Sequence, residues 1–190
     1  YEIKKSVLNS INVLNVRSIE TLYLHQNEID IISDKNIIDA LAKVKSDGYV
    51  KKIGVSVYNI EECNFALRSQ IYDVIQLPVS ILDSHIYSQI NNLGLSKEIV
   101  ARSIFLQGIL FNRTNINQQI KQSEDLSLYL RTLDEISYKH KYSLVDLAVA
   151  FVAGLSMVDN LIVGTSSEKN LEDIFKASKI KLPNDLINHL

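Results

Sequence analysis

The sequence predicts an α/β fold in which short parallel strands alternate with helices. Two observations lead to this prediction. Short apolar runs that suit buried strands recur along the chain, and segments with helical spacing of apolar residues separate them. Such alternation is typical of βα units, which build a parallel sheet. Both an open doubly wound sheet and a closed barrel fit this pattern, and periodicity alone does not choose between them.

The strands are predicted from length and composition. They are expected at residues 21–24, 52–56, 73–76, 98–102 and 161–163. Pro78 is expected to stop the third strand, because proline cannot donate to the ladder. Helices are expected over residues 4–16, 36–47, 60–69, 84–92 and 166–178, in a long segment ending near His140, and after Pro183. Gly48 is predicted to end the second helix, and Ser143 with Asp146 to form a capping box.

Composition limits the class of protein. The 190 residues suit one domain, and 46% are hydrophobic and 22% charged, as in ordinary globular proteins. A net charge of −2 argues against the clustered basic face of a nucleic-acid-binding protein. No apolar run approaches the roughly 20 residues that span a bilayer. The single cysteine, Cys63, fits the reducing cytoplasm and reads as a bystander thiol, and the histidines lack metal-ligand spacing.

Polar or small residues stand at the carboxyl end of every predicted strand. They are His25, Ser56, Gln76, the pair Arg102 and Ser103, and the run Gly164, Thr165 and Ser166. Active sites of barrels and ligand sites of open sheets are both built at this edge. The alternative is that strands simply have to end in polar residues.

These strand ends carry a resemblance to a known family. The matching segments are Leu22-Tyr23-Leu24-His25, Ile53-Gly54-Val55-Ser56, Gln76-Leu77-Pro78, Ala101-Arg102-Ser103, Leu106-Gln107-Gly108-Ile109-Leu110 and Gly164-Thr165-Ser166-Ser167. Their order and approximate spacing resemble the aldo-keto reductases over nearly the whole chain. The resemblance favours the (β/α)₈ barrel. It implies an oxidoreductase that reduces aldehydes or ketones by hydride transfer from NADPH, with NADH as the alternative cofactor.

The resemblance assigns one catalytic residue to this chain. The family uses a Tyr acid, a Lys, an Asp and a His, and only the His has a counterpart, His25. The others match positions before Tyr1, and Tyr23 lies within a strand and is not the acid. An imidazole suits carbonyl orientation and proton exchange because its ordinary pKa lies near neutrality. The alternative for His25 is a partly buried histidine bonded at a strand end.

The remaining assignments concern the cofactor. Ser56 and Gln76 resemble the pair that holds the nicotinamide carboxamide, which needs a donor and an acceptor. Arg102 matches a position near the nicotinamide, Ser103 matches a hydroxyl for the pyrophosphate, and Phe105 falls in the following loop. The alternatives are a self-bonded serine at Ser56 and a rim salt bridge at Arg102.

The adenosine half of the cofactor is assigned to Gly164, Thr165, Ser166, Asn170 and Asp173, at the start of a helix that can receive a phosphate. Relatives that prefer NADPH often carry a Lys and an Arg at the positions of Gly164 and Asn170, so the cofactor preference stays open. Helix capping by Ser166 and Ser167 is the alternative interpretation, and both can hold together.

Residues 1–190 are expected to form a single aldo-keto reductase-like domain that is incomplete at its N-terminus. A closed barrel needs about 250 residues, and the strands resemble the family's fourth to eighth. The fragment alone is expected to be inactive. A cofactor-binding regulatory subunit similar to potassium-channel β subunits, or a non-catalytic truncated product, is the alternative to an enzyme.

We predict that the isolated 190-residue chain folds poorly, because an open set of barrel strands exposes two unpaired edges and its inward-facing apolar side chains. Limited digestion with trypsin should therefore cut it throughout its length. A compact, protease-resistant product would contradict this expectation.

Overall fold

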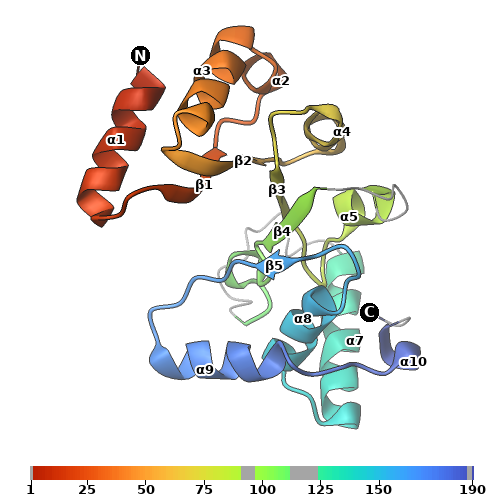
Figure 1. Cartoon of the computed structure of the whole chain (residues 1–190). Helices are drawn as coiled ribbons and strands as arrows, with labels where there is room; N and C mark the ends of the chain where they lie inside the picture. Colours follow the sequence, from red (N-terminus) through yellow and green to blue (C-terminus); the bar gives the residue numbers. More distant parts are fainter. Residues whose placement is uncertain (1, 91–96, 112–123, 188–189) are drawn as a thin grey trace. The chain divides into compact units, whose positions relative to one another are not determined.

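The computed structural model describes residues 2–90, 97–111, 124–187 and 190, and its strands form one five-stranded sheet in the order β1-β2-β3-β4-β5 (Figure 1). The strands are β1 (Ile19–Leu24), β2 (Val50–Ser56), β3 (Val74–Pro78), β4 (Glu98–Arg102) and β5 (Asn160–Leu161). Helices separate them along the chain: α1 (Glu2–Leu14), α2 (Ile29–Ile32), α3 (Lys35–Ser46), α4 (Ile60–Arg68), α5 (His85–Ile90), the 3₁₀ turn η1 (Leu106–Gly108), α7 (Glu124–His140), α8 (Leu144–Ala153), α9 (Glu168–Ala177) and α10 (Asn184–Ile187). The predicted alternation of parallel strands with helices is confirmed.

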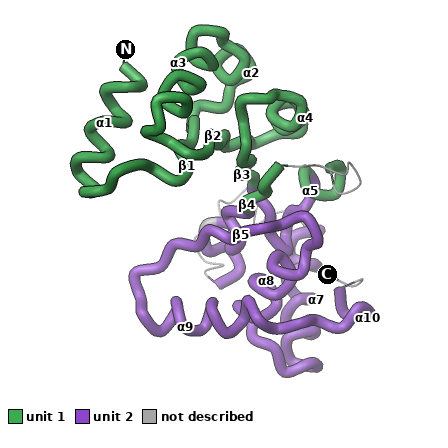
Figure 2. Tube along the Cα trace, in the orientation of Figure 1, with its two compact units in different colours: residues 1–77, 86–100 green, residues 78–85, 101–190 purple. Residues whose placement is uncertain are grey.

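The chain divides into two compact units (Figure 2). Unit 1 contains residues 1–77 and 86–100, and unit 2 contains residues 78–85 and 101–190. The assignment of residues 1–190 to one domain stays a prediction.

In unit 1 the register of the parallel strands brings their carboxyl ends to the same level. Leu24 of β1 pairs with Val55 of β2, and Ser56 of β2 pairs with Gln76 of β3. The Glu98 N–H donates to the Asp73 carbonyl at 3.1 Å, which adds β4 beside β3. From Ile53 to Ser56 every residue of β2 is buried, as expected for a strand covered on both faces.

Two neighbouring side chains fasten β3 to the helices of unit 1. The Tyr72 hydroxyl is fully buried and donates to the Ile32 carbonyl at 2.7 Å, and burial raises the pKa of Tyr72 to about 12. The Asp73 carboxylate accepts from Lys45 Nζ at 2.6 Å and from the Ile53 N–H at 2.8 Å. The carboxylate of Asp73, the residue before β3, thus bonds both α3 and β2.

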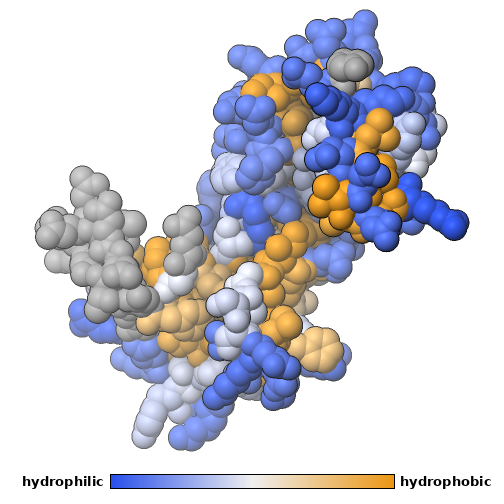
Figure 3. Space-filling model, turned by 90° about the vertical axis from the view of Figure 1, so that its left-hand side faces the viewer, coloured by the Kyte–Doolittle hydropathy of each residue, from blue (hydrophilic) through white to orange (hydrophobic). Residues whose placement is uncertain are grey.

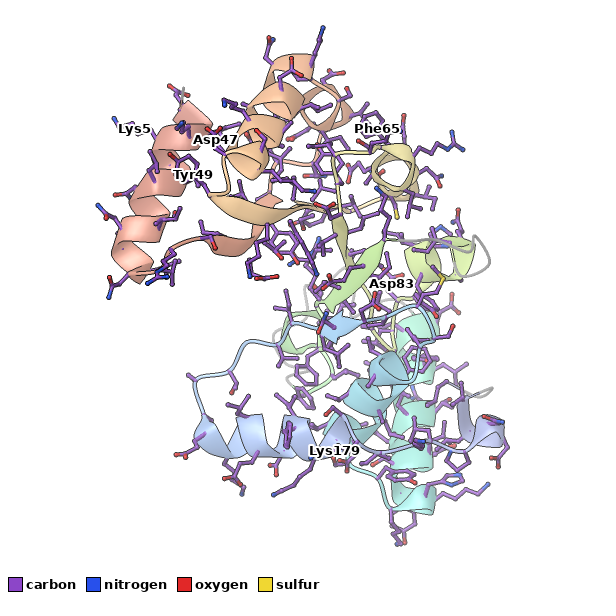
Figure 4. All side chains as sticks on the ribbon, viewed as in Figure 1. Lys5, Asp47, Tyr49, Phe65, Asp83 and Lys179 are labelled. Carbon is purple, nitrogen blue, oxygen red and sulfur yellow. The ribbon has the colours of Figure 1, made fainter. Side chains whose placement is uncertain are left out.

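Helix ends follow the sequence closely. Gly48 has φ 79° just after α3, and its N–H donates to the Lys45 carbonyl at 3.0 Å, so the predicted stop is confirmed. Lys4 of α1 bonds the Asp47 carboxylate at 3.0 Å and lies over the Tyr49 ring, beside this stop. Asp47 and Tyr49 are labelled in Figure 4. The capping box of Ser143 and Asp146 at the start of α8 is confirmed too.

Unit 2 has its own core beneath α8 and α9. Leu147, Val149 and Val152 of α8 are fully buried, and Ile174 and Ala177 form the buried face of α9. Two further apolar residues of α9 are exposed: Leu171 is 53% exposed and Phe175 61%. Hydrophobic residues therefore reach the surface of the molecule among hydrophilic ones, as the face in Figure 3 shows.

Some boundaries differ from the predictions. β5 is Asn160–Leu161 rather than residues 161–163, although the Ile162 N–H still donates to the Ala101 carbonyl at 2.8 Å. Pro78 is the last residue of β3 instead of following its end. α2 was not predicted, because one helical turn is too short to show a 3.6-residue period.

Positions 91–92 of the helix expected over 84–92 lie outside the described residues, as do residues 112–119, whose polar sequence predicts a connection. Across the part of the chain that the structure describes, every helix is too short or too polar to cross a bilayer.

Gly54 supports the register by leaving room for an aromatic ring. Gly54 pairs with Tyr23 across the strands, and a Cβ atom at Gly54 would lie 2.6 Å from two ring carbons of Tyr23. We predict that Gly54→Ala lowers the free energy of unfolding by about 1–3 kcal/mol, the usual cost of overpacking. Denaturant titration of the full-length protein measures this change.

Gly164→Ala is the matched control, because a Cβ atom at Gly164 would meet nothing within 4 Å. Equal unfolding midpoints for the two variants would contradict the proposed clash at Gly54.

Candidate functional site

Three predicted site residues stand at adjacent strand ends in unit 1. His25 follows β1, Ser56 ends β2, and Gln76 lies in β3. Because Leu24 pairs with Val55, the next residues along these strands are His25 and Ser56, and Ser56 in turn pairs with Gln76. The register therefore sets the three residues in a row at the carboxyl edge of three neighbouring strands.

Ser56 and Gln76 are bonded to each other. The Ser56 Oγ donates to Gln76 Oε1 at 3.3 Å, and Ser56 is fully buried. The Gln76 carbonyl accepts the Val57 N–H at 2.9 Å, which fixes the backbone of both residues. The hydroxyl of Ser56 thus bonds the side chain of Gln76, the residue with which the family resemblance paired it. His25 is exposed, in contrast to the partly buried histidine of the alternative interpretation.

Unit 2 contains a cavity of about 650 Å³. Its walls are Ser103, Ile104, Phe105, Gly108, Phe111, Val145, Ile162, Val163, Gly164, Thr165, Asn170, Asp173 and Ile174. The volume lies within the range of about 300–1,000 Å³ typical of small-molecule sites. Several residues that follow the fourth and fifth strands were assigned to the cofactor, and most of them line this one cavity.

The segment after β4 reaches the cavity through an unusual backbone. Ser103 has φ 59° and Leu106 φ 46°, so two non-glycine residues occupy the left-handed region. Each such residue costs about 1–2 kcal/mol, and buried neighbours have to offset that cost. Ile104 and Leu110 are each 1% exposed and anchor the turn, which leaves Ser103 and Phe105 on the cavity wall.

Arg102 bonds the first residue of this turn. Its Nη1 donates to Ser103 Oγ at 3.1 Å, so the guanidinium helps orient a hydroxyl that lines the cavity. Arg102 and Ser166 are not among the described residues that line the cavity. The two residues adjoin the cavity-lining segments without contributing to the wall.

The start of α9 forms another part of the cavity wall. The Thr165 Oγ1 accepts the Ser167 N–H at 3.1 Å, and the Ser167 Oγ accepts the Asn170 N–H at 3.3 Å. Ser167 is therefore the N-cap, and the two bonds hold Thr165 and Asn170 towards the same cavity. Asp173, one turn further on, adds a half-exposed carboxylate to the wall.

The cavity combines apolar surface with a few polar groups. The rings of Phe105 and Phe111 lie 5.3 Å apart between centroids at 59°, and side chains from α8 and α9 continue the apolar wall. Hydroxyl, amide and carboxylate groups face it from Ser103, Thr165, Asn170 and Asp173. Such a lining suits a ligand with a flat ring and a hydroxylated or phosphorylated part.

Sequence reasoning missed the apolar half of the cavity. Ile104, Phe111, Val145 and Ile174 line it, and none was predicted as a site residue. Ile104 lies between Ser103 and Phe105 and Ile174 follows Asp173, so proximity to predicted residues was an available signal for these two. Val145 lies in α8, far away in sequence, and no motif marks it.

The structure therefore brings the predicted residues together in two sets: His25, Ser56 and Gln76 in unit 1, and the cavity residues of unit 2. That the two sets share one cofactor stays a prediction. Within the described residues there is no group of three or more His, Cys, Asp or Glu side chains suited to a metal ion.

A parallel sheet with a ligand-sized cavity at a strand end defines an α/β protein of the barrel or doubly wound type. The model of the aldo/keto reductase family matches residues 1–190, so the chain belongs to that family. The sheet and its helices are accordingly part of a (β/α)₈ barrel. No curated protein sequence matches the chain significantly.

Several solved structures share this fold. The holo form of aldo-keto reductase AKR11C1 from Bacillus halodurans has a TM-score of 0.80 and 21% identity, with 98% of this chain and 65% of that chain covered. The glycerol dehydrogenase AKR11B4 from Gluconobacter oxydans has a TM-score of 0.78 and 20% identity, with 98% and 62% covered. The chain thus spans somewhat less than two thirds of the length of these two proteins.

Ser167→Ala should lower the free energy of unfolding by about 1 kcal/mol, because it removes the side-chain acceptor at the start of α9. Ser166→Ala, one residue earlier and exposed, is the control and should change it far less. Denaturant titration of the full-length protein compares the two variants. A larger loss in Ser166→Ala would show that the helix is capped differently.

Proposed function

We propose that the protein is a carbonyl reductase that transfers a hydride from NADPH, or from NADH, to an aldehyde or ketone. The observation that carries the proposal is the cavity of unit 2, because the residues that the family resemblance assigns to the cofactor gather on its walls. Family membership supports the same reaction class. We further propose a cytoplasmic location and a small carbonyl compound as substrate, without nucleic-acid or membrane partners.

The residues of unit 2 fit the adenosine and phosphate parts of such a cofactor. Gly164 leaves open space where any other residue would carry a side chain, so a ligand can approach its backbone closely. Thr165 and the first turn of α9 offer hydroxyl and N–H donors to a phosphate. Asn170 and Asp173 offer polar atoms to the adenosine.

The residues of unit 1 fit the nicotinamide and the substrate. The Gln76 amide, which is only partly buried, would meet the carboxamide, and the buried Ser56 hydroxyl holds Gln76 Oε1 and would complete the pair, on two strands whose backbones are fixed. Holding the carboxamide selects the ring face that meets the substrate. His25 would donate a hydrogen bond to the carbonyl oxygen, which orients the substrate and favours the negative charge that develops there.

The reaction balances as one hydride and one proton. A reduced nicotinamide supplies the hydride to the carbonyl carbon when it is bound, and a proton on the oxygen completes the alcohol. The family resemblance gives the proton donor as a Tyr acid, with His25 sharing the proton traffic. The residues of this chain would bind the cofactor, orient the carbonyl group and hold its oxygen.

We predict that the full-length protein binds NADPH or NADH and oxidises it in the presence of an aldehyde from a broad panel. Gly164→Leu should weaken cofactor binding at least about tenfold, or about 1.4 kcal/mol, because the new side chain occupies the cavity. Isothermal titration calorimetry measures binding of both cofactors, and loss of the nicotinamide absorbance measures turnover.

Gly164→Ala, which adds only a methyl group to open space, is the control, and both variants should unfold at the wild-type midpoint. Tight binding without turnover on any aldehyde would favour a regulatory subunit over an enzyme. Failure to bind either cofactor would refute the proposal.

A further inference from the structure

Glu62 is a buried carboxylate that the candidate site does not use. It lies in the first turn of α4, and only 5% of the residue is exposed. Burying a carboxylate is costly unless hydrogen bonds replace the lost water. The partners of Glu62 therefore indicate what the carboxylate holds in place.

Three donors converge on the two carboxylate oxygens. Oε1 accepts from Asn27 Nδ2 at 2.7 Å and from Asn59 Nδ2 at 2.6 Å. Oε2 accepts the Tyr58 N–H at 2.7 Å. Asn59 in turn caps α4, because its Oδ1 accepts the Glu62 N–H at 2.9 Å. An ionised carboxylate only accepts hydrogen bonds, so it suits a place where every neighbour is a donor.

These bonds join two loops that both leave the site edge of the sheet. Asn27 is two residues beyond His25, on the connection from β1 to α2. Tyr58 and Asn59 follow Ser56, on the connection from β2 to α4. The bond between Asn27 and Glu62 therefore ties the loop that carries His25 to the loop that begins at Ser56. It spans 35 positions in the sequence.

The far end of the first loop is anchored separately. Ile32 in α2 is fully buried, and its carbonyl accepts the hydroxyl of Tyr72 at 2.7 Å. At the near end, Leu24 is held in the ladder beside Val55. Between these two anchors, Asn27 supplies a third fixed point close to His25. Because His25 is exposed, its position depends on the backbone of this short loop.

We propose that Glu62 is a positioning residue, which holds His25 in place for the carbonyl substrate through its bond to Asn27. The inference rests on the proposed function, since it gives His25 a substrate to orient. Glutamine in place of Glu62 would turn one acceptor into a donor, which would then face the Tyr58 N–H or the two amide groups. The loop that carries His25 would lose its fixed point without any loss of core volume.

Matched variants separate this role from simple helix capping. Asn27→Ala removes only the bond between the loops and leaves the bonds of Glu62 to Tyr58 and Asn59. Glu62→Gln perturbs both sets. Glu61→Gln makes the same charge change at the exposed neighbouring position and is the control.

In the full-length protein, Asn27→Ala and Glu62→Gln should lower kcat at least about tenfold and leave the Kd for NADPH unchanged, because misplacing an orienting group slows the reaction. Glu61→Gln should keep wild-type kcat. In a His25→Asn background, Asn27→Ala should cause no further loss, because it acts through His25. Losses that multiply in that background, or an unchanged kcat in Asn27→Ala, would overturn the proposal.

A second measurement does not depend on turnover. The His25 ring signals in the NMR spectrum, assigned by their absence in His25→Asn, should shift in Asn27→Ala and not in Glu61→Gln. Unchanged signals in Asn27→Ala would overturn the positioning role. If wild type lacks turnover while these signals shift, the proposed function fails and the link from Glu62 to His25 stands.

Discussion

The register of the parallel strands is the constraint on which the other features depend. In unit 1 it pairs Leu24 with Val55 and Ser56 with Gln76, so that polar strand ends stand side by side. A slip of one residue would turn every side chain of a strand to the opposite face of the sheet. Ser56 would then lie out of reach of Gln76, and Gly54 would no longer leave room for the Tyr23 ring. Packing and site geometry therefore require the same register.

In unit 2, a shorter pairing of β4 with β5 positions two of the segments that line the cavity. The Ile162 N–H donates to the Ala101 carbonyl at 2.8 Å, which aligns the last residues of β4 with the end of β5. The segments that follow, from Ser103 and from Gly164, both line the cavity. The strain of the left-handed Ser103 is the local cost of turning the first segment towards the second.

Features carried by local patterns were predictable from the sequence, and features made by distant contacts were not. The strand end at Ser56 and the caps at Gly48 and Ser143 rest on a few adjacent residues, whereas β3 continues past the predicted end at Gln76 to Pro78. The apolar cavity wall at Val145 and the bond from Asn27 to Glu62 depend on segments that meet only in the fold. A glutamate in the first turn of a helix normally reads as a favourable surface charge, so nothing local marked Glu62 as buried.

Two glycines in or just beyond the strands differ in what occupies the space beside them. At Gly54 the missing side chain is filled by the Tyr23 ring, so the glycine serves packing within the sheet. At Gly164 nothing lies within 4 Å of the position that a Cβ would occupy, and the residue lines the cavity, so the space there remains for a ligand. A small residue within a strand is thus explained by its neighbours in the protein. Gly164, just beyond β5, instead leaves open space on the cavity wall, which is the room that the proposed cofactor needs.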